Sequence, residues 1–158
     1  MSTLENLYKQ VILDHSRRPR HFGELPGATH TESGHNPSCG DHVQLMVRLD
    51  GDVIADARFT GKGCAISVAS ASLMTSALRG KTVAEAAQLE QAFLTMIRTG
   101  APDATLGDLM ALQGVHALHT RVKCATLPWQ TLDVLLGQTG SDTAPNLPAD
   151  TRADPAGD

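Results

Sequence analysis

The stretch HVQLMVRLDGDVIADARFT, residues 42–60, carries the clearest structural signal in the chain. In residues 43–50 an apolar side chain recurs at every second position, which is typical of a strand with one buried face. Asp50-Gly51 predicts a hairpin turn, and residues 53–60 would return as the next strand. The segment ATHTESGH, residues 28–35, predicts an earlier strand. We therefore expect a small antiparallel sheet of three strands.

Helical patterns flank this sheet on both sides. Residues 2–15 place apolar side chains at helical spacing, and Pro19 and the glycines that follow end the helix. After the sheet, the spacing of apolar residues and the capping residues predict four more helical segments. They cover residues 64–80, 82 to about 98, 105–114 and 124–137, so we expect about five helices in all.

The composition indicates one globular domain with a polar tail. The chain has 158 residues, of which 41% are hydrophobic and 19% charged, which fits one domain. After Gly137 the sequence is dominated by Gly, Pro, Asp, Thr and Ala. We predict that residues 1–137 form the domain and that residues 138–158 are a disordered tail.

The charge and hydropathy of the chain argue against several classes of partner. The formal net charge of −4 predicts no general affinity for nucleic acid or for an anionic membrane. No apolar run approaches the roughly 20 residues that span a bilayer, and MSTLENLYKQ lacks the apolar core of a signal peptide. We therefore expect a cytoplasmic protein.

Three cysteines lie at three junctions between predicted elements. Cys39 is in the turn NPSCGD, Cys64 is at a junction from strand to helix, and Cys124 is at the start of the last helix. An odd number of cysteines in a reducing compartment argues against a disulfide framework. Helix N-termini favour thiolates, which are good metal ligands and nucleophiles. Inert buried thiols are the alternative, but the placement favours metal binding or sulfur chemistry.

The sequence leaves the fourth ligand of such a site open. Zinc prefers four ligands in a tetrahedron, and three thiolates leave one position to fill. Asp41 is the nearest candidate, two residues after Cys39 across a glycine. His35 and His42 flank the same turn and compete with Asp41 on distance alone.

Four motifs in the same order resemble the IscU/NifU-type proteins of iron–sulfur cluster biogenesis. They are LYKQVILDHSRRPRHFG (7–23), NPSCGD (36–41), GKGCAISVASASLMT (61–75) and RVKCATLPW (121–129). The resemblance spans roughly residues 4–136. It implies an α+β fold with a three-stranded antiparallel sheet and packed helices.

Two departures from IscU scaffolds favour the SufU branch. IscU-type chains carry a histidine directly before the third cysteine, where this chain has Lys123, and an LPPVK segment upstream, where it has HALHTRV. The segment TLGDLMALQGVHALHT, residues 105–120, is similar to the insertion that distinguishes SufU proteins.

The resemblance implies a metal site and a reaction. The site would consist of Cys39, Asp41, Cys64 and Cys124 around Zn²⁺, in a zinc-dependent sulfurtransferase that accepts persulfide sulfur from a SufS-type cysteine desulfurase and passes it to the Suf-type assembly machinery. Cys39 is the expected acceptor, because a ligand on a glycine-bounded turn can leave the metal more easily than one held in a helix.

The same resemblance leaves two further questions open. Arg121 matches a basic position of the SufU motif. It would pair with an acidic group of the desulfurase or steady the persulfide, and the alternative is a surface arginine with no special role. The alternative function is a scaffold on which iron and sulfur assemble as a [2Fe–2S] cluster, since thiolates also hold such clusters.

Overall fold

A three-stranded antiparallel sheet packs on helices, as the α+β prediction requires. The computed structural model describes residues 3–37 and 40–139. In chain order the elements are α1 (Thr3–Arg17), β1 (His30–Asn36), β2 (Asp41–Asp50), β3 (Val53–Lys62), α2 (Ala65–Leu78), α3 (Val83–Thr99), the 3₁₀ helices η1 (Ala104–Ala117) and η2 (His119–Arg121), and α4 (Val122–Thr139).

The sheet has the strand order β1-β2-β3, with both neighbouring pairs antiparallel. Every second side chain near the start of β2 is buried, namely Val43, Leu45 and Val47, and Leu45 lies opposite Phe59 of β3. The strand predicted at residues 28–35 is confirmed as β1. The outer edge of β3 pairs with the segment that follows α1, through hydrogen bonds between Phe59 and the backbone of His21 and Gly23.

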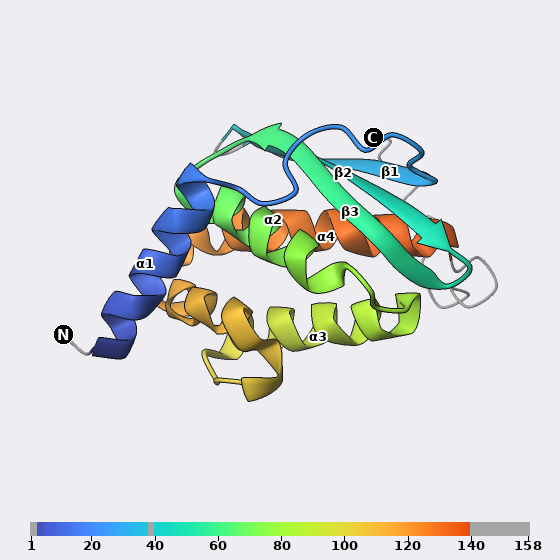
Figure 1. The fold of residues 1–158 in the computed structure, drawn as a ribbon. Helices are drawn as coiled ribbons and strands as arrows, with labels where there is room; N and C mark the ends of the chain where they lie inside the picture. The colour runs from blue at the N-terminus through green and yellow to red at the C-terminus, as the bar shows by residue number, and fades with distance from the viewer. Residues whose placement is uncertain (1–2, 38–39, 140–158) are drawn as a thin grey trace.

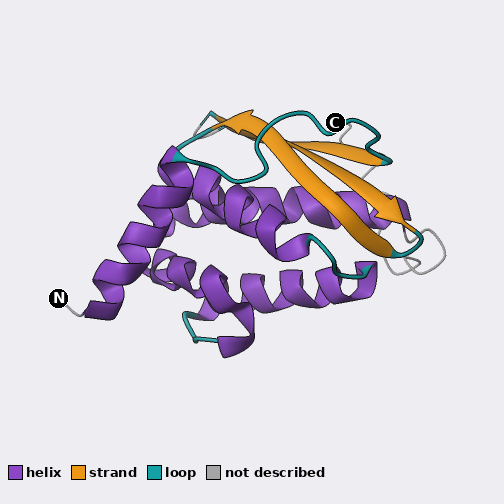
Figure 2. Ribbon diagram, in the orientation of Figure 1, coloured by secondary structure: helices purple, strands orange, loops and turns teal. Residues whose placement is uncertain are grey.

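The helices form two layers beneath one face of the sheet (Figures 1 and 2). α2 and α4 contact the strands directly, α3 and η1 lie on the far side of them, and α1 packs against α2 and η1. The ring of Phe93 in α3 stacks on Trp129 in α4, with ring centroids 4.4 Å apart. The core therefore runs from the sheet through α2 and α4 to α3.

A glycine in β1 allows the sheet to close onto α4. A Cβ atom at Gly34 would overlap the side chain of Thr131 and press on Leu127. Any larger residue at this position would push β1 away from the helix. The start of β2 lies opposite the end of β1, with Asp41 paired to Asn36, so Gly34 also helps to place this end of the sheet.

The capping residues of the helix predicted from residue 82 to about residue 98 are confirmed, whereas two other helices differ in detail. Thr82 and Glu85 form a capping box on α3, and Gly100 ends that helix in the left-handed conformation. Among the described residues there are four α-helices, because the segment predicted at 105–114 is the 3₁₀ helix η1, which is kinked at Gly107. Glycine tolerates the positive φ of that kink.

The last helix begins earlier than predicted. α4 starts at Val122 rather than around Cys124 to Thr126, so Pro128 lies inside it. A proline cannot donate to the carbonyl four residues before it. The buried Ser70 of α2 supports this turn, since its hydroxyl donates to the carbonyl of Ala125 (2.6 Å) and accepts from Nε1 of Trp129 (3.0 Å).

The described helices include none that is long and apolar enough to cross a membrane. α4 extends to Thr139, two residues beyond the predicted domain boundary at residue 137. The predicted disordered tail lies outside the described residues from residue 140 onward. The division of the chain at residue 137 stays a prediction.

Candidate metal centre

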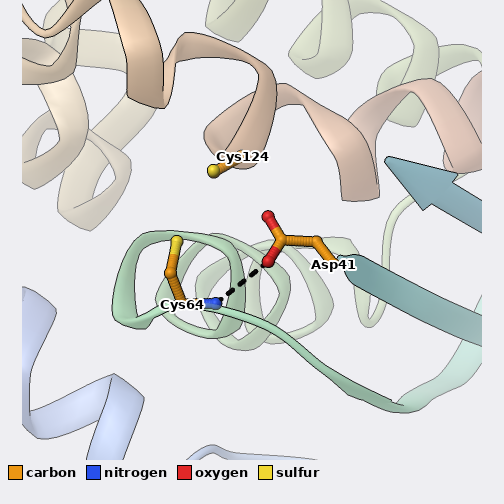
Figure 3. A group of neighbouring side chains, drawn as sticks. All are labelled: Asp41, Cys64 and Cys124. Carbon is orange, nitrogen blue, oxygen red and sulfur yellow. Dashed lines mark hydrogen bonds between the residues drawn. The ribbon is translucent and has the colours of Figure 1, made fainter. Parts of the chain in front are cut away.

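Three of the four predicted ligands meet at one end of the sheet. The carboxylate of Asp41 and the sulfur atoms of Cys64 and Cys124 all lie within 4.8 Å of one another (Figure 3). Asp41 begins β2, Cys64 caps α2 and Cys124 lies in the first turn of α4, so three separate elements build the cluster. The fourth predicted ligand, Cys39, lies outside the described residues.

Cys64 occupies the N-cap position of α2 with an extended backbone. Its carbonyl accepts the first helical hydrogen bond, from the N–H of Val68 (3.1 Å), and a second hydrogen bond from the hydroxyl of Ser67 (3.0 Å). Its own N–H donates to Oδ1 of Asp41 (3.1 Å). The carboxylate therefore makes the bond that the acidic residue of a capping box would make, to the N–H of the N-cap residue, at the helix end that favours negative charge.

The second oxygen of Asp41 is the strongest sign that this cluster binds a cation. Asp41 is only 1% exposed, and its Oδ2 has no hydrogen-bond partner within the part of the chain that the structure describes. A buried carboxylate oxygen without a partner is costly. In Figure 3 this oxygen points toward the sulfur atom of Cys124. A metal ion bound by both thiolates would satisfy it, so these residues fit a metal.

Gly63 and Ser67 complete the pocket around the carboxylate, and sequence reasoning missed both. A Cβ atom at Gly63 would overlap Oγ of Ser67 and lie 2.7 Å from Oδ1 of Asp41. Only a glycine leaves room for this carboxylate directly before the cysteine. The signal in the sequence was the glycine directly before Cys64, at the junction from strand to helix.

Cys124 is fully buried, and hydrogen bonds to α2 stabilise the part of α4 that follows it. Ala125 and Trp129 of α4 are linked through the hydroxyl of Ser70 to α2, the helix that Cys64 caps. All three linking residues are buried. Because one hydrogen-bonded link joins the two helices that carry the cysteines, it fixes the spacing between their sulfur atoms.

The two histidines that competed with Asp41 lie on the other face of the sheet. Side chains alternate along β2, so Asp41 is buried toward the helices whereas the next residue, His42, is exposed. His35 is the direct partner of His42 on β1 and is exposed as well. Neither histidine belongs to the cluster of Asp41, Cys64 and Cys124.

Arg121 lies beside both cysteines, at the end of η2. A hydrogen bond to Cys124, supported by the charge of Cys64, raises the pKa of Arg121 above its usual value. Arg121 and its neighbour Lys123 are exposed. The guanidinium of Arg121 therefore lies against the sulfur atoms and is open to solvent.

The donor set determines which ions suit this centre. Two thiolates and one carboxylate are typical ligands of zinc, and thiolates also hold iron–sulfur clusters. The Asp41–Cys64–Cys124 cluster leaves one position of a tetrahedral ion for a further ligand. Cys39, which lies outside the described residues, is the ligand predicted for this position.

Comparisons with known proteins agree with this geometry. The family model of the NifU-like N-terminal domain matches residues 7–125. The zinc-dependent sulfurtransferase SufU of Bacillus subtilis is 44% identical over 134 residues, which cover 84% of this chain and 90% of that protein. The iron–sulfur cluster assembly scaffold protein IscU of Streptococcus pyogenes is 42% identical and covers 84% of each chain.

A solved structure has the same fold. The crystal structure of a candidate iron–sulfur cluster assembly scaffold protein for the SUF system, from Fervidobacterium islandicum AW-1, matches with a TM-score of 0.77 at 37% identity, over 84% of this chain and 98% of that one. Together with the matched family model, these similarities show that the chain belongs to the family of NifU-like N-terminal domains, whose relatives here are named as a zinc-dependent sulfurtransferase and as iron–sulfur cluster assembly scaffold proteins.

Proposed function

We propose that this protein is a zinc-dependent acceptor of persulfide sulfur in iron–sulfur cluster assembly. The observation that carries the proposal is the buried Oδ2 of Asp41, which faces the sulfur atoms of Cys64 and Cys124 and has no other partner among the described residues. The identity of 44% to a relative named as a zinc-dependent sulfurtransferase supports zinc as the ion.

Asp41, Cys64 and Cys124 would hold the zinc ion, with Cys39 as the fourth ligand. Bound zinc keeps its thiol ligands deprotonated and protects them from oxidation. Asp41 and Cys64 are fixed by their mutual hydrogen bond, and Cys124 is fixed by its burial. Gly40 directly follows Cys39 in the sequence, so we expect Cys39 to leave the metal more easily than a ligand held in a helix.

Cys39 would accept the sulfur by thiol exchange. Its thiolate attacks the terminal sulfur of the persulfide on a SufS-type cysteine desulfurase, forming a new S–S bond. The S–S bond of the desulfurase breaks, and the desulfurase cysteine leaves as a thiolate that can react again. The sulfur then passes from Cys39 to the Suf-type assembly machinery, and we place this reaction in the cytoplasm.

Arg121 would bind either the desulfurase or the persulfide. Its guanidinium is exposed and lies against the cysteines, so it can meet an acidic group of the desulfurase or pair with a persulfide anion. We expect Arg121→Gln to keep its zinc and to stimulate the desulfurase less than the unchanged protein does.

The test separates the two roles of Cys39. Purified protein should contain about one zinc per chain and should raise the turnover of a SufS-type desulfurase. Cys39→His keeps a zinc ligand but removes the acceptor sulfur, so it should retain zinc and lose the stimulation. Full stimulation by Cys39→His would show that another group accepts the sulfur.

A scaffold function is the second candidate, favoured by the identity of 42% to a relative named as an IscU scaffold. It requires a [2Fe–2S] cluster to form on the same thiolates and to leave again. Anaerobic reconstitution followed by transfer to an apo-ferredoxin would support the scaffold. Failure of iron and sulfide to displace the zinc would count against it.

A further inference from the structure

The outer face of the sheet carries a pair of histidines behind the metal centre. His35 of β1 and His42 of β2 are direct partners in the antiparallel register. Partners of this kind point to the same face, with Cβ atoms roughly 4.5–5.5 Å apart. Both residues are exposed, whereas Asn36 and Asp41, which form the next pair, are buried. The two imidazoles therefore stand side by side in solvent.

The histidine pair lines a groove on this face. The groove has a volume of about 370 Å³, and its other polar side chains come from Ser33, Gln44 and Thr60. Thr60 and Ser33 are each the direct strand partner of Gln44, so all three belong to one row across the sheet. Their hydroxyl and amide groups can orient the water molecules that complete the shell of a bound ion.

We propose that His35 and His42 form a second metal site, which takes a divalent transition metal ion such as Zn²⁺. Imidazole nitrogen is a preferred ligand of zinc, copper and nickel. The pair would supply two nitrogen ligands, and water would fill the remaining positions. This site differs from the centre at Asp41, because the alternation of β2 puts the side chains of residues 41 and 42 on opposite faces of the sheet.

The second site binds more weakly than the centre of Asp41, Cys64 and Cys124. It offers two neutral ligands in solvent, whereas the first centre offers thiolates and a carboxylate at a largely buried position. Lys62 of β3 is the direct partner of His42 on its other side and is also exposed. Its positive charge opposes a cation bound at the pair.

The experiment titrates Zn²⁺ onto the full chain after the first equivalent has bound. Histidine ring signals are followed by NMR, and heat is followed by calorimetry at constant pH. We expect a second, weaker binding event that shifts the rings of His35 and His42. It should disappear in His35→Ala and in His42→Ala, while the first equivalent stays bound in both variants.

His30→Ala is the matched control, because His30 lies on the same strand but pairs with Val47 and its ring bonds to Thr29. This variant should keep the second event. A second event that survives in His35→Ala and His42→Ala, or its absence from the unchanged protein, would overturn the proposal. These outcomes do not depend on the sulfur-transfer reaction.

A charge variant tests the position of the ion. Lys62→Gln removes the positive charge next to His42 and should tighten the second binding event several-fold, with no effect on the first equivalent. Weaker or unchanged binding in Lys62→Gln would contradict an ion placed between the two histidines.

Discussion

Among the residues that the structure describes, two carboxyl groups are buried, and their surroundings differ. Asp41 at the start of β2 is 1% exposed, and Glu90 of α3 is 3% exposed. Glu90 lies at the seam with α4, where burial, and then the charge of Asp133 and a hydrogen bond to it, raises its pKa to about 8. Asp41 has a backbone N–H on one oxygen and two sulfur atoms facing the other.

The difference shows that the partners of a buried acid, rather than its burial, indicate its role. At the α3–α4 seam a proton neutralises Glu90, which shares a hydrogen bond with Asp133. At the metal centre the described residues offer Oδ2 of Asp41 no such partner, and the two cysteines supply further ligands. The surroundings of Glu90 thus suit a proton, whereas those of Asp41 suit the metal ion that we propose.

The largest expected effect is on zinc affinity, when each of the two acids is replaced by its amide in a separate variant. Asp41→Asn removes an anionic ligand, and we expect zinc affinity to fall by about 100-fold or more, since even outer partners of metal ligands contribute roughly 10- to 100-fold. Glu90→Gln should leave zinc affinity unchanged. Competition with a chromophoric chelator measures both. An equal loss of zinc affinity in the two variants would show that Asp41 is no more a metal ligand than Glu90 is.

Gly63→Ala tests the space around Asp41 without removing a ligand. The added methyl group would meet Oδ1 of Asp41 and Oγ of Ser67, so the carboxylate must move. We expect zinc affinity to fall by about 10- to 100-fold, in the range found for partners that orient a ligand. Gly114→Ala is the control, because a Cβ atom added at Gly114 would meet open space. Zinc binding of Gly63→Ala that equals the control would show that the carboxylate needs no such space.

The pH dependence of stability tests the role of Glu90. Its pKa is raised to about 8 in the folded protein from a reference value of 4.5, so between these values the folded chain holds one more proton than the unfolded chain. The free energy of unfolding therefore falls as pH rises through this window, by at most about 1.4 kcal/mol per pH unit.

Glu90→Gln cannot titrate and should flatten this dependence. Urea unfolding at several pH values measures it, and Glu24→Gln, at an exposed position outside the helices, serves as the control. If Glu90→Gln and the control lose stability with pH at the same rate, Glu90 does not hold the proton in the folded chain.

Much of the fold was predictable because its signals are local. The alternation of residues 43–49, the capping box of Thr82 and Glu85, and the glycine stop at Gly100 each depend on neighbouring residues alone. The start of α4 was predicted wrongly, because the link from Ser70 to Ala125 and Trp129 joins residues more than fifty positions apart. Propensity rules for Pro128 contain no such contact.

In the candidate site, too, some features were predictable from the sequence and others were not. Convergence of Cys64 and Cys124 was predicted from their positions at helix starts, and the structure confirms it together with Asp41. Distance along the chain could not choose between Asp41 and His42, whereas the alternation of β2 separates them at once. The role of Gly63 was not predicted, because it depends on the absence of a Cβ atom next to Asp41 and Ser67, two residues whose positions the sequence does not give.

The central claim is that Cys39 accepts sulfur at a zinc centre built on Asp41, Cys64 and Cys124. Mass spectrometry of the zinc-loaded chain, after incubation with a SufS-type desulfurase and cysteine, tests it most directly. We predict an adduct with the mass of one sulfur atom on the peptide that contains Cys39, and no adduct in Cys39→His. An adduct on Cys64 or Cys124, or one that persists in Cys39→His, would contradict the account.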